Sequence, residues 1–319
     1  MLWKYFLPAS GGLTERRTIV TNAGWRAMGA LAITAVALVA GCGSGGSSSA
    51  AGAGTAGATP TVSASRAAVG YWTRDRLLAA QPSRNWTLPS SPPATPGTTP
   101  SGHVPVIPAP RVGALFSHSA SGDHFCTASV VDSPRHDLLI TAAHCIYGSN
   151  SGYNQDIVFI PGYQDGAEPY GVWTPSKLLV DPHWASSSDP DYDVGFVVLE
   201  PNAGKNIQGV LGANQMGFNA GYSHLVRVTG YPSTANAPVT CINWTTEQSA
   251  TQLKFDCGGY FDGTSGSPWL TKFDLQTRTG TIVGVIGGYQ QGGDTPSISY
   301  SVYLNDSIRT LYQQAEALG

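Results

Sequence analysis

Charged side chains are scarce in this chain. Asp, Glu, Lys and Arg make up 12% of its 319 residues, and the formal net charge is -3. A nucleic-acid-binding surface needs a basic patch or stripe, and the sequence shows neither. We therefore expect no nucleic-acid partner. The low charge is instead typical of an extracellular globular domain rich in Gly, Ser, Thr and Asn turns.

No apolar run near the N-terminus reaches transmembrane length. Residues 27–40 form a run of about 14 residues, whereas a spanning helix needs roughly 20. Arginines precede the run, as in a signal peptide. Residues 38–42 (LVAGC) resemble the lipobox of bacterial lipoproteins, in which the Cys is acylated. We expect a signal peptide over 1–41 and a lipid anchor on Cys42. An ordinary signal peptide cut nearby, with that Cys unmodified, is the alternative.

Cysteine is also rare, and the chain has five. An odd number in an exported protein leaves one thiol to explain, and acylation of Cys42 accounts for it. The other four permit three pairings. We favour the pairings that are local in sequence, Cys126 with Cys145 and Cys241 with Cys257. Disulfides persist in oxidising compartments, so we expect the protein outside the cell, anchored to the membrane only through its lipidated Cys.

The first third of the chain is poor in apolar residues. Residues 43–58 are almost entirely Gly, Ser, Ala and Thr, which is typical of a flexible coil. Residues 82–110 are rich in Pro, Ser and Thr and predict an extended spacer. The island at 67–80 has helical character, and it is either part of a pro-segment that docks on the domain or a fortuitous helix in a linker. We expect a stalk or pro-segment over 42–110 and the folded domain over 111–319.

The remaining region consists of about ten short apolar segments separated by Gly and Pro turns. This pattern is typical of an all-β sandwich or barrel. Only residues 306–318 have helical periodicity, with Ile308, Leu311 and Ala315 on one face. The sequence therefore predicts an all-β domain that ends in a helix.

One of the seven histidines stands out. His144 follows an apolar strand in the segment LITAAHC and precedes a cysteine. A bridge from Cys145 to Cys126 would fix this turn and hold the imidazole still. Imidazole exchanges protons readily at neutral pH, which suits general acid–base catalysis.

An aspartate precedes a predicted buried strand in DYDVGFVVL. A carboxylate at Asp193 is able to accept the Nδ1–H of a histidine and fix its tautomer. Four acidic residues also fall at the ligand positions of a calcium-binding EF-hand loop: Asp189, Asp191, Asp193 and Glu200. However, Val194 occupies the position where that loop needs Gly. A further alternative is that Asp193 merely ends a strand.

A third motif, GTSGSP, covers residues 263–268. A nucleophilic Ser needs an exposed turn with backbone N–H groups directed at the developing oxyanion, and Gly permits that approach. We expect Ser265 to be the nucleophile and the N–H groups of Gly263 and Ser265 to form the oxyanion hole. Ser267 stands where the Gly-x-Ser-x-Gly elbow needs Gly, which argues against an α/β-hydrolase.

The order His, Asp, Ser within these motifs resembles the trypsin/chymotrypsin-like serine peptidases over about 112–305. GTSGSP resembles the bacterial branch that includes the glutamyl endopeptidases. The resemblance implies two six-stranded antiparallel β-barrels with the site between them. It also implies that His144 is the general base, Asp193 its orienting carboxylate and Ser265 the nucleophile.

Several positions depart from the family pattern. In the animal enzymes of this family, an Asp directly precedes the nucleophilic Ser and binds the new N-terminus that forms on activation. Thr264 stands at that position here, so we do not expect this activation switch. Gly287 replaces a Ser that contacts the triad Asp, so another group must do so. Ile286 stands where the Glu-specific enzymes carry a His, and Gly259 stands where the Arg/Lys-specific enzymes carry an Asp. The resemblance therefore supports neither of these two specificities. We expect a preference for apolar or aromatic side chains, in a pocket formed by Gly259, Tyr260, Gly287, Gly288 and Tyr289.

The sequence therefore predicts a secreted or surface-anchored serine endopeptidase that acts on polypeptides through an acyl-enzyme. Because triads serve several acyl chemistries, an esterase is one alternative, and a catalytically silent surface-binding module is another. No His, Cys or carboxylate cluster has convincing ligand spacing, so we expect neither a metal nor an organic cofactor. We also expect a monomer.

Overall fold

The computed structural model describes residues 57–58, 62–83, 104–105 and 110–319. All of them belong to one compact unit, residues 52–319. The predicted signal peptide, the lipid anchor on Cys42 and most of the predicted stalk lie outside the described residues. Within the described part of the chain, no helix is long and apolar enough to cross a membrane.

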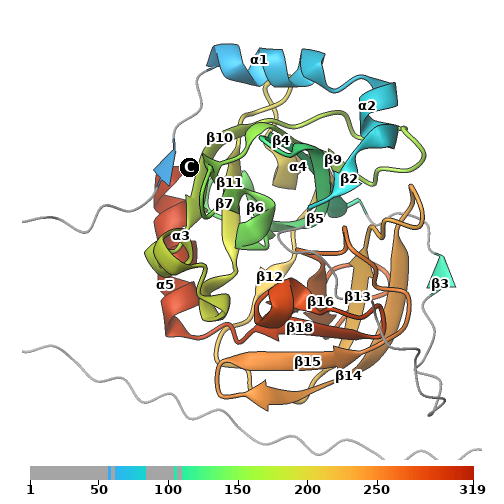
Figure 1. The fold of residues 1–319 in the computed structure, drawn as a ribbon, viewed down its shortest axis with the longest axis vertical. Helices are drawn as coiled ribbons and strands as arrows, with labels where there is room; N and C mark the ends of the chain where they lie inside the picture. The colour runs from blue at the N-terminus through green and yellow to red at the C-terminus, as the bar shows by residue number, and fades with distance from the viewer. Residues whose placement is uncertain (1–56, 59–61, 84–103, 106–109) are drawn as a thin grey trace, which may run out of the picture. The chain divides into compact units, whose positions relative to one another are not determined.

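Two largely antiparallel sheets form the domain (Figure 1), and each has six main strands and two short ones. The first sheet, here the first barrel, has the order β1-β10-β11-β6-β5-β4-β9, with β2 on β5. Its main strands are β4 (Val112–Ser119), β5 (Gly122–Val131), β6 (Leu138–Thr141), β9 (Gln155–Pro161), β10 (Pro175–Val180) and β11 (Gly195–Leu199). Its short strands are β1 (Gly57–Ala58) and β2 (Gln81–Pro82).

The second sheet, here the second barrel, has the order β12-β17-β16-β13-β14-β15-β18, with β3 on β14. Its main strands are β13 (Leu225–Gly230), β14 (Val239–Ser249), β15 (Gln252–Asp256), β16 (Pro268–Thr271), β17 (Thr281–Val285) and β18 (Ile298–Val302). Its short strands are β3 (Val104–Pro105) and β12 (Gln215–Met216), and a separate hairpin joins β7 (Tyr147–Gly148) to β8 (Gly152–Tyr153). The predicted all-β, double-barrel fold is confirmed.

Helices are few and mostly short. The α-helices are α1 (Val62–Tyr71), α2 (Arg74–Ala79), α3 (Pro182–Ser187), α4 (Ile207–Leu211) and α5 (Asp306–Leu318), and the 3₁₀ helices are η1 (Ala143–Cys145), η2 (Pro190–Tyr192) and η3 (Tyr289–Gly292). The C-terminal helix α5 is the one that the sequence predicts. Asn305 caps it by accepting from the N–H groups of Ser307 and Ile308.

Strands β6 and β11 lie side by side, with Phe196 opposite Ile140, and both are covered on two faces. Leu139 and Val197 point into the core of the first barrel. Ile140 and Phe196 face a second cluster that includes α5 and residues of the second barrel. Burial on both faces explains why these strands are continuous apolar runs rather than alternating ones.

Both disulfides that the sequence favours are present. Cys126 on β5 is bonded to Cys145 at the end of η1, and Cys241 on β14 is bonded to Cys257 just after β15. The first disulfide joins β5 to the turn that carries His144.

Residues 65–83, here called the docked segment, pack on the first barrel (Figure 1). Trp72 and Leu77 are only 5% and 2% exposed and share a core cluster with Phe116 and Ile160. The folded part of the chain therefore includes residues well before the expected boundary at 111. Of the two alternatives for the island at 67–80, the described residues have the one in which it docks on the domain.

We expect Trp72→Ala to lower the free energy of unfolding by about 3 kcal/mol, because truncating a buried aromatic side chain removes its packing and leaves a cavity. Guanidinium denaturation measures the change. Val69→Ala is the matched control on the same segment, since Val69 is 46% exposed, and it should change stability by less than about 0.5 kcal/mol. Equal effects of the two substitutions would contradict the docking.

Candidate active site

His144 lies in η1, directly after β6, and only 3% of it is exposed. Two ties fix this turn. Thr141, the last residue of β6, donates its Oγ1–H to the carbonyl of Thr127 on β5 (2.8 Å). The disulfide from Cys145 to Cys126 joins the same two segments. The backbone that carries the imidazole is therefore held from both sides.

Asp193 lies between η2 and β11, and its side chain is fully buried. Its Oδ2 is 2.8 Å from His144 Nδ1, and its Oδ1 accepts the backbone N–H of His144 (3.0 Å). Oδ2 also accepts the N–H of Gly288 (2.9 Å). A carboxylate that binds Nδ1–H fixes the imidazole tautomer and leaves Nε2 free to act as a base.

Gly288 thus supplies the contact for which the sequence offered no side chain. A Cβ added to Gly287 would lie 2.9 Å from the carbonyl oxygen of Asp193 and 3.2 Å from its Oδ2. The backbone packs closely against the aspartate there, and the next N–H donates to it. A backbone donor carries no sequence signal, so sequence reasoning had no means of finding it.

Ser265 lies in a tight turn and is 8% exposed. The turn packs against the first barrel, because the N–H of Thr127 donates to the carbonyl of Ser265 (2.8 Å). Gly266 has φ +82, and an added Cβ would lie 2.0 Å from the Thr127 carbonyl oxygen. Only Gly fits this position, which brings the serine turn against the end of β6.

Two backbone N–H groups at this turn have no acceptor in the part of the chain that the structure describes. Among the described residues, neither the N–H of Gly263 nor that of Ser265 makes a hydrogen bond, whereas those of Thr264, Gly266 and Ser267 do. Free N–H groups beside a serine hydroxyl are what an oxyanion hole requires. No hydrogen bond joins the Ser265 hydroxyl to His144 within the described part of the chain, and such contacts often tighten only when substrate binds.

The residues expected to line a substrate pocket differ in their burial and partners. Tyr260 is 5% exposed, packs with Phe255 and Trp269 in the core of the second barrel and donates its hydroxyl to the Val228 carbonyl (2.8 Å). Gly287 and Gly288 support Asp193. The side chain of Tyr289 is 43% exposed, and Gly259 is half-buried.

Gln252 on β15 is a site residue that sequence reasoning missed. It is 4% exposed, and its Nε2 donates to the Pro190 carbonyl (3.1 Å) and to Asp191 Oδ1 (2.7 Å). Its Oε1 accepts the N–H of Tyr289 (3.0 Å). Gln252 therefore joins the segment before Asp193 to the segment that contains Gly288. A glutamine in an ordinary strand carries no motif, and only its burial reveals the role.

The described residues contain one group of His, Cys and carboxylate side chains close enough to share a metal ion, namely Cys126, His144 and Cys145. Both sulfurs are in a disulfide, so neither is available as a thiolate ligand. The aspartates of the calcium-loop pattern are also engaged elsewhere. Asp189 caps η2 by accepting from the N–H of Asp191, whose own carboxylate binds Gln252.

Comparison with solved structures gives the same fold. A protease, Anisep, from Arthrobacter nicotinovorans is 26% identical with a TM-score of 0.61, covering 67% of this chain and 98% of that one. A thermostable serine protease, AL20, from an extremophilic microorganism is 25% identical with a TM-score of 0.60, covering 66% and 99%. A Glu endopeptidase is similar in fold, at 17% identity, a TM-score of 0.55, and 68% and 97% coverage.

Sequence comparison gives one partial relative and one family. An extracellular metalloprotease of Bacillus subtilis is 26% identical over 114 residues, which are 36% of this chain and 35% of that protein. The match thus spans about a third of the relative's length. The family model described as Trypsin matches residues 107–308, a range that includes His144, Asp193 and Ser265. The chain therefore belongs to the trypsin family.

Proposed function

We propose that the protein is a serine endopeptidase in which Ser265, His144 and Asp193 form the catalytic triad. The observation that carries the proposal is the buried Asp193 carboxylate, which binds both the Nδ1 and the backbone N–H of His144. Beside it, the turn of Ser265 presents two N–H groups without acceptors among the described residues. Family membership supports the same chemistry.

The reaction proceeds by acyl transfer. Ser265 Oγ attacks the substrate carbonyl carbon while His144 Nε2 takes the hydroxyl proton. The N–H groups of Gly263 and Ser265 stabilise the oxyanion of the tetrahedral intermediate. The C–N bond breaks as the imidazolium returns its proton to the leaving amine. Water then attacks the acyl-enzyme by the same sequence, and the product acid and free Ser265 result.

The preferred residue before the scissile bond is proposed to be apolar or aromatic. Ile286 is apolar and 3% exposed, and Gly259 has no side chain, so neither position offers a charge to a charged substrate group. The protein is proposed to act outside the cell, which both disulfides support, and to be held at the membrane by acylated Cys42.

Ser265→Ala should abolish labelling by a fluorophosphonate probe, because the probe reacts with an activated serine hydroxyl. In-gel fluorescence measures the labelling. Ser307→Ala, which removes an exposed hydroxyl in the first turn of α5, should leave it intact. An unlabelled wild-type protein, under conditions that label a known serine hydrolase, would indicate a catalytically silent binding module instead.

Asp193→Asn should lower kcat/KM by roughly 10³- to 10⁴-fold, because an amide places the imidazole in the wrong tautomer. The rate is measured on a peptide selected from a library, which also reports the preferred residue and separates a peptidase from an esterase. Asp189→Asn is the control, since Asn caps a helix as well as Asp does. Similar losses in both variants would argue against the role of Asp193.

Mass spectrometry of the mature protein from a bacterial host should find diacylglyceryl-Cys42 as the first residue. Cys42→Ala should move the protein from the membrane fraction to the medium, because the acyl chains supply the membrane affinity. An unmodified N-terminus at another residue would overturn the anchor.

A further inference from the structure

One edge of β5 is left free by the strands of the barrel itself. Strand β4 pairs with β5 from Gly122 to Ser129. On the other side, β6 pairs only with residues 129–131. A strand edge that no barrel strand pairs with is able to bind extended polypeptide through backbone hydrogen bonds.

This edge of β5 contacts the turn that carries the proposed nucleophile, Ser265. The N–H of Thr127 on β5 donates to the carbonyl of Ser265, and its Oγ1 donates to the carbonyl of Gly263 (3.1 Å). Two residues earlier, the ring of Phe125 packs so closely on Gly263 that an added Cβ would lie 2.3 Å from it. An extended substrate that leaves the site along this edge therefore passes the backbone of Phe125.

The same edge adjoins the proposed general base, because the disulfide between Cys126 and Cys145 ties it to the turn of His144. His144 must protonate the amine that leaves. The half of the substrate that follows the scissile bond accordingly lies on the side of the imidazole, next to this edge.

The chain's own docked segment already occupies the edge. Strand β2 pairs with it in parallel, with Gln81 opposite His124 and Pro82 opposite Phe125. The N–H of Ser83 donates to the carbonyl of Phe125 (3.0 Å), and the Ser83 hydroxyl donates to the carbonyl of His144 (3.4 Å). The backbone acceptor that a departing substrate chain would meet is thus taken by Ser83.

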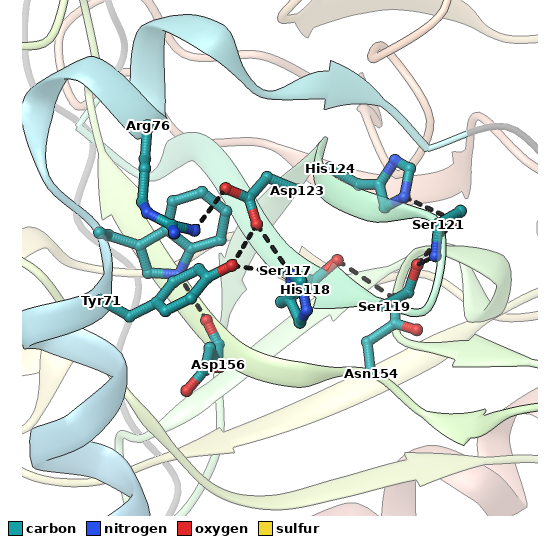
Figure 2. Close-up of polar contacts among 11 residues, drawn as sticks. Tyr71, Arg76, Ser117, His118, Ser119, Ser121, Asp123, His124, Asn154 and Asp156 are labelled. Atoms are coloured by element: carbon teal, nitrogen blue, oxygen red, sulfur yellow. Dashed lines mark hydrogen bonds and ion pairs between the residues drawn. The ribbon is translucent and has the colours of Figure 1, made fainter.

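A polar network anchors the docked segment beside this pairing (Figure 2). The Tyr71 hydroxyl donates to Asp123 Oδ1 (2.6 Å), and the Arg76 guanidinium donates to Asp123 Oδ2 (2.9 Å). His118 Nδ1 lies 2.8 Å from the same carboxylate, and Arg76 stacks on the Tyr71 ring.

The electrostatics of Asp123 keep this anchor in place at neutral pH. Partial burial raises the pKa of the Asp123 carboxyl, but hydrogen bonds from Tyr71 and His118 and the charge of Arg76 outweigh it, so the pKa is lowered. The carboxylate stays ionised, and it lies on β5 immediately before the residues that pair with β2.

We propose that the docked segment, residues 65–83, determines substrate selection on the leaving-group side of the active site. Ser83 competes with the substrate for the Phe125 carbonyl, so the enzyme favours substrates with few residues after the scissile bond. The proposal rests on the proposed function, because it assigns this edge to the leaving half of a peptide.

Two substrates with the same sequence before the scissile bond test the proposal. One ends in a p-nitroanilide and has no residue after that bond, and the other is an internally quenched peptide with four residues after it. Titration with the fluorophosphonate probe gives the concentration of active enzyme for each variant, so that misfolded protein does not enter the rates.

Ser83→Pro removes the N–H that donates to Phe125. We expect it to raise kcat/KM for the long peptide about fivefold, the effect of one backbone hydrogen bond, and to leave the anilide within about twofold. Ser83→Ala keeps the N–H and should keep the wild-type ratio of the two rates. Equal changes on both substrates, or a selective loss on the long peptide, would overturn the proposal.

The double variant Tyr71→Phe, Arg76→Met loosens the anchor without altering residue 83. It should raise the ratio of long-peptide to anilide rates in the same direction as Ser83→Pro. If the ratio stays at the wild-type value in both variants while the anilide is cleaved, the inference falls and the proposed function stands. An unlabelled wild-type protein that cleaves neither substrate would overturn both.

Discussion

The carboxylate of Asp193 is fully buried, and its hydrogen-bond donors come from both barrels. Burying a charge costs several kcal/mol unless donors surround it. His144 supplies two of these donors from the first barrel, and Gly288 supplies one from the second. Pairing this one charge therefore ties the two sheets together at the site, and it orients the imidazole at the same time. Gln252 reinforces the junction, because it binds both the segment that precedes Asp193 and the segment that contains Gly288.

The sequence carries clear signals for those parts of the site whose chemistry restricts the residue type. A histidine after an apolar strand, an aspartate before one and a serine in a Gly-rich turn are such parts, and the structure brings His144 and Asp193 into contact. Gly288 and Gln252 carry no comparable signal. A backbone N–H is present in almost every residue, and the burial of Gln252 depends on strands far from it in the sequence.

Two buried aromatic residues have placements that share a common cause. Tyr260, expected at the substrate pocket, packs in the core of the second barrel, where the Val228 carbonyl provides a partner for its hydroxyl. Trp72 belongs to the island for which docking and a linker were both left open, and it lies in the core around Phe116, with its indole N–H donated to the Asp156 carbonyl. Amphipathic aromatic residues are buried wherever a polar partner is available, and local sequence does not show where that partner is.

The burial of β6 and β11 on both faces also affects which parts of the molecule unfold locally. His144 and Asp193 stand at the ends of strands whose two faces are covered by separate clusters. A fluctuation that separates the two residues must break both clusters, so we expect the backbone amides of β6 and β11 to be among the slowest to exchange. The docked segment pairs with β5 through only two residues of β2. Trp72 and Leu77 hold the rest of the segment in a core cluster, so only the end that contains β2 is able to open in a separate, lower-energy step while the triad stays assembled.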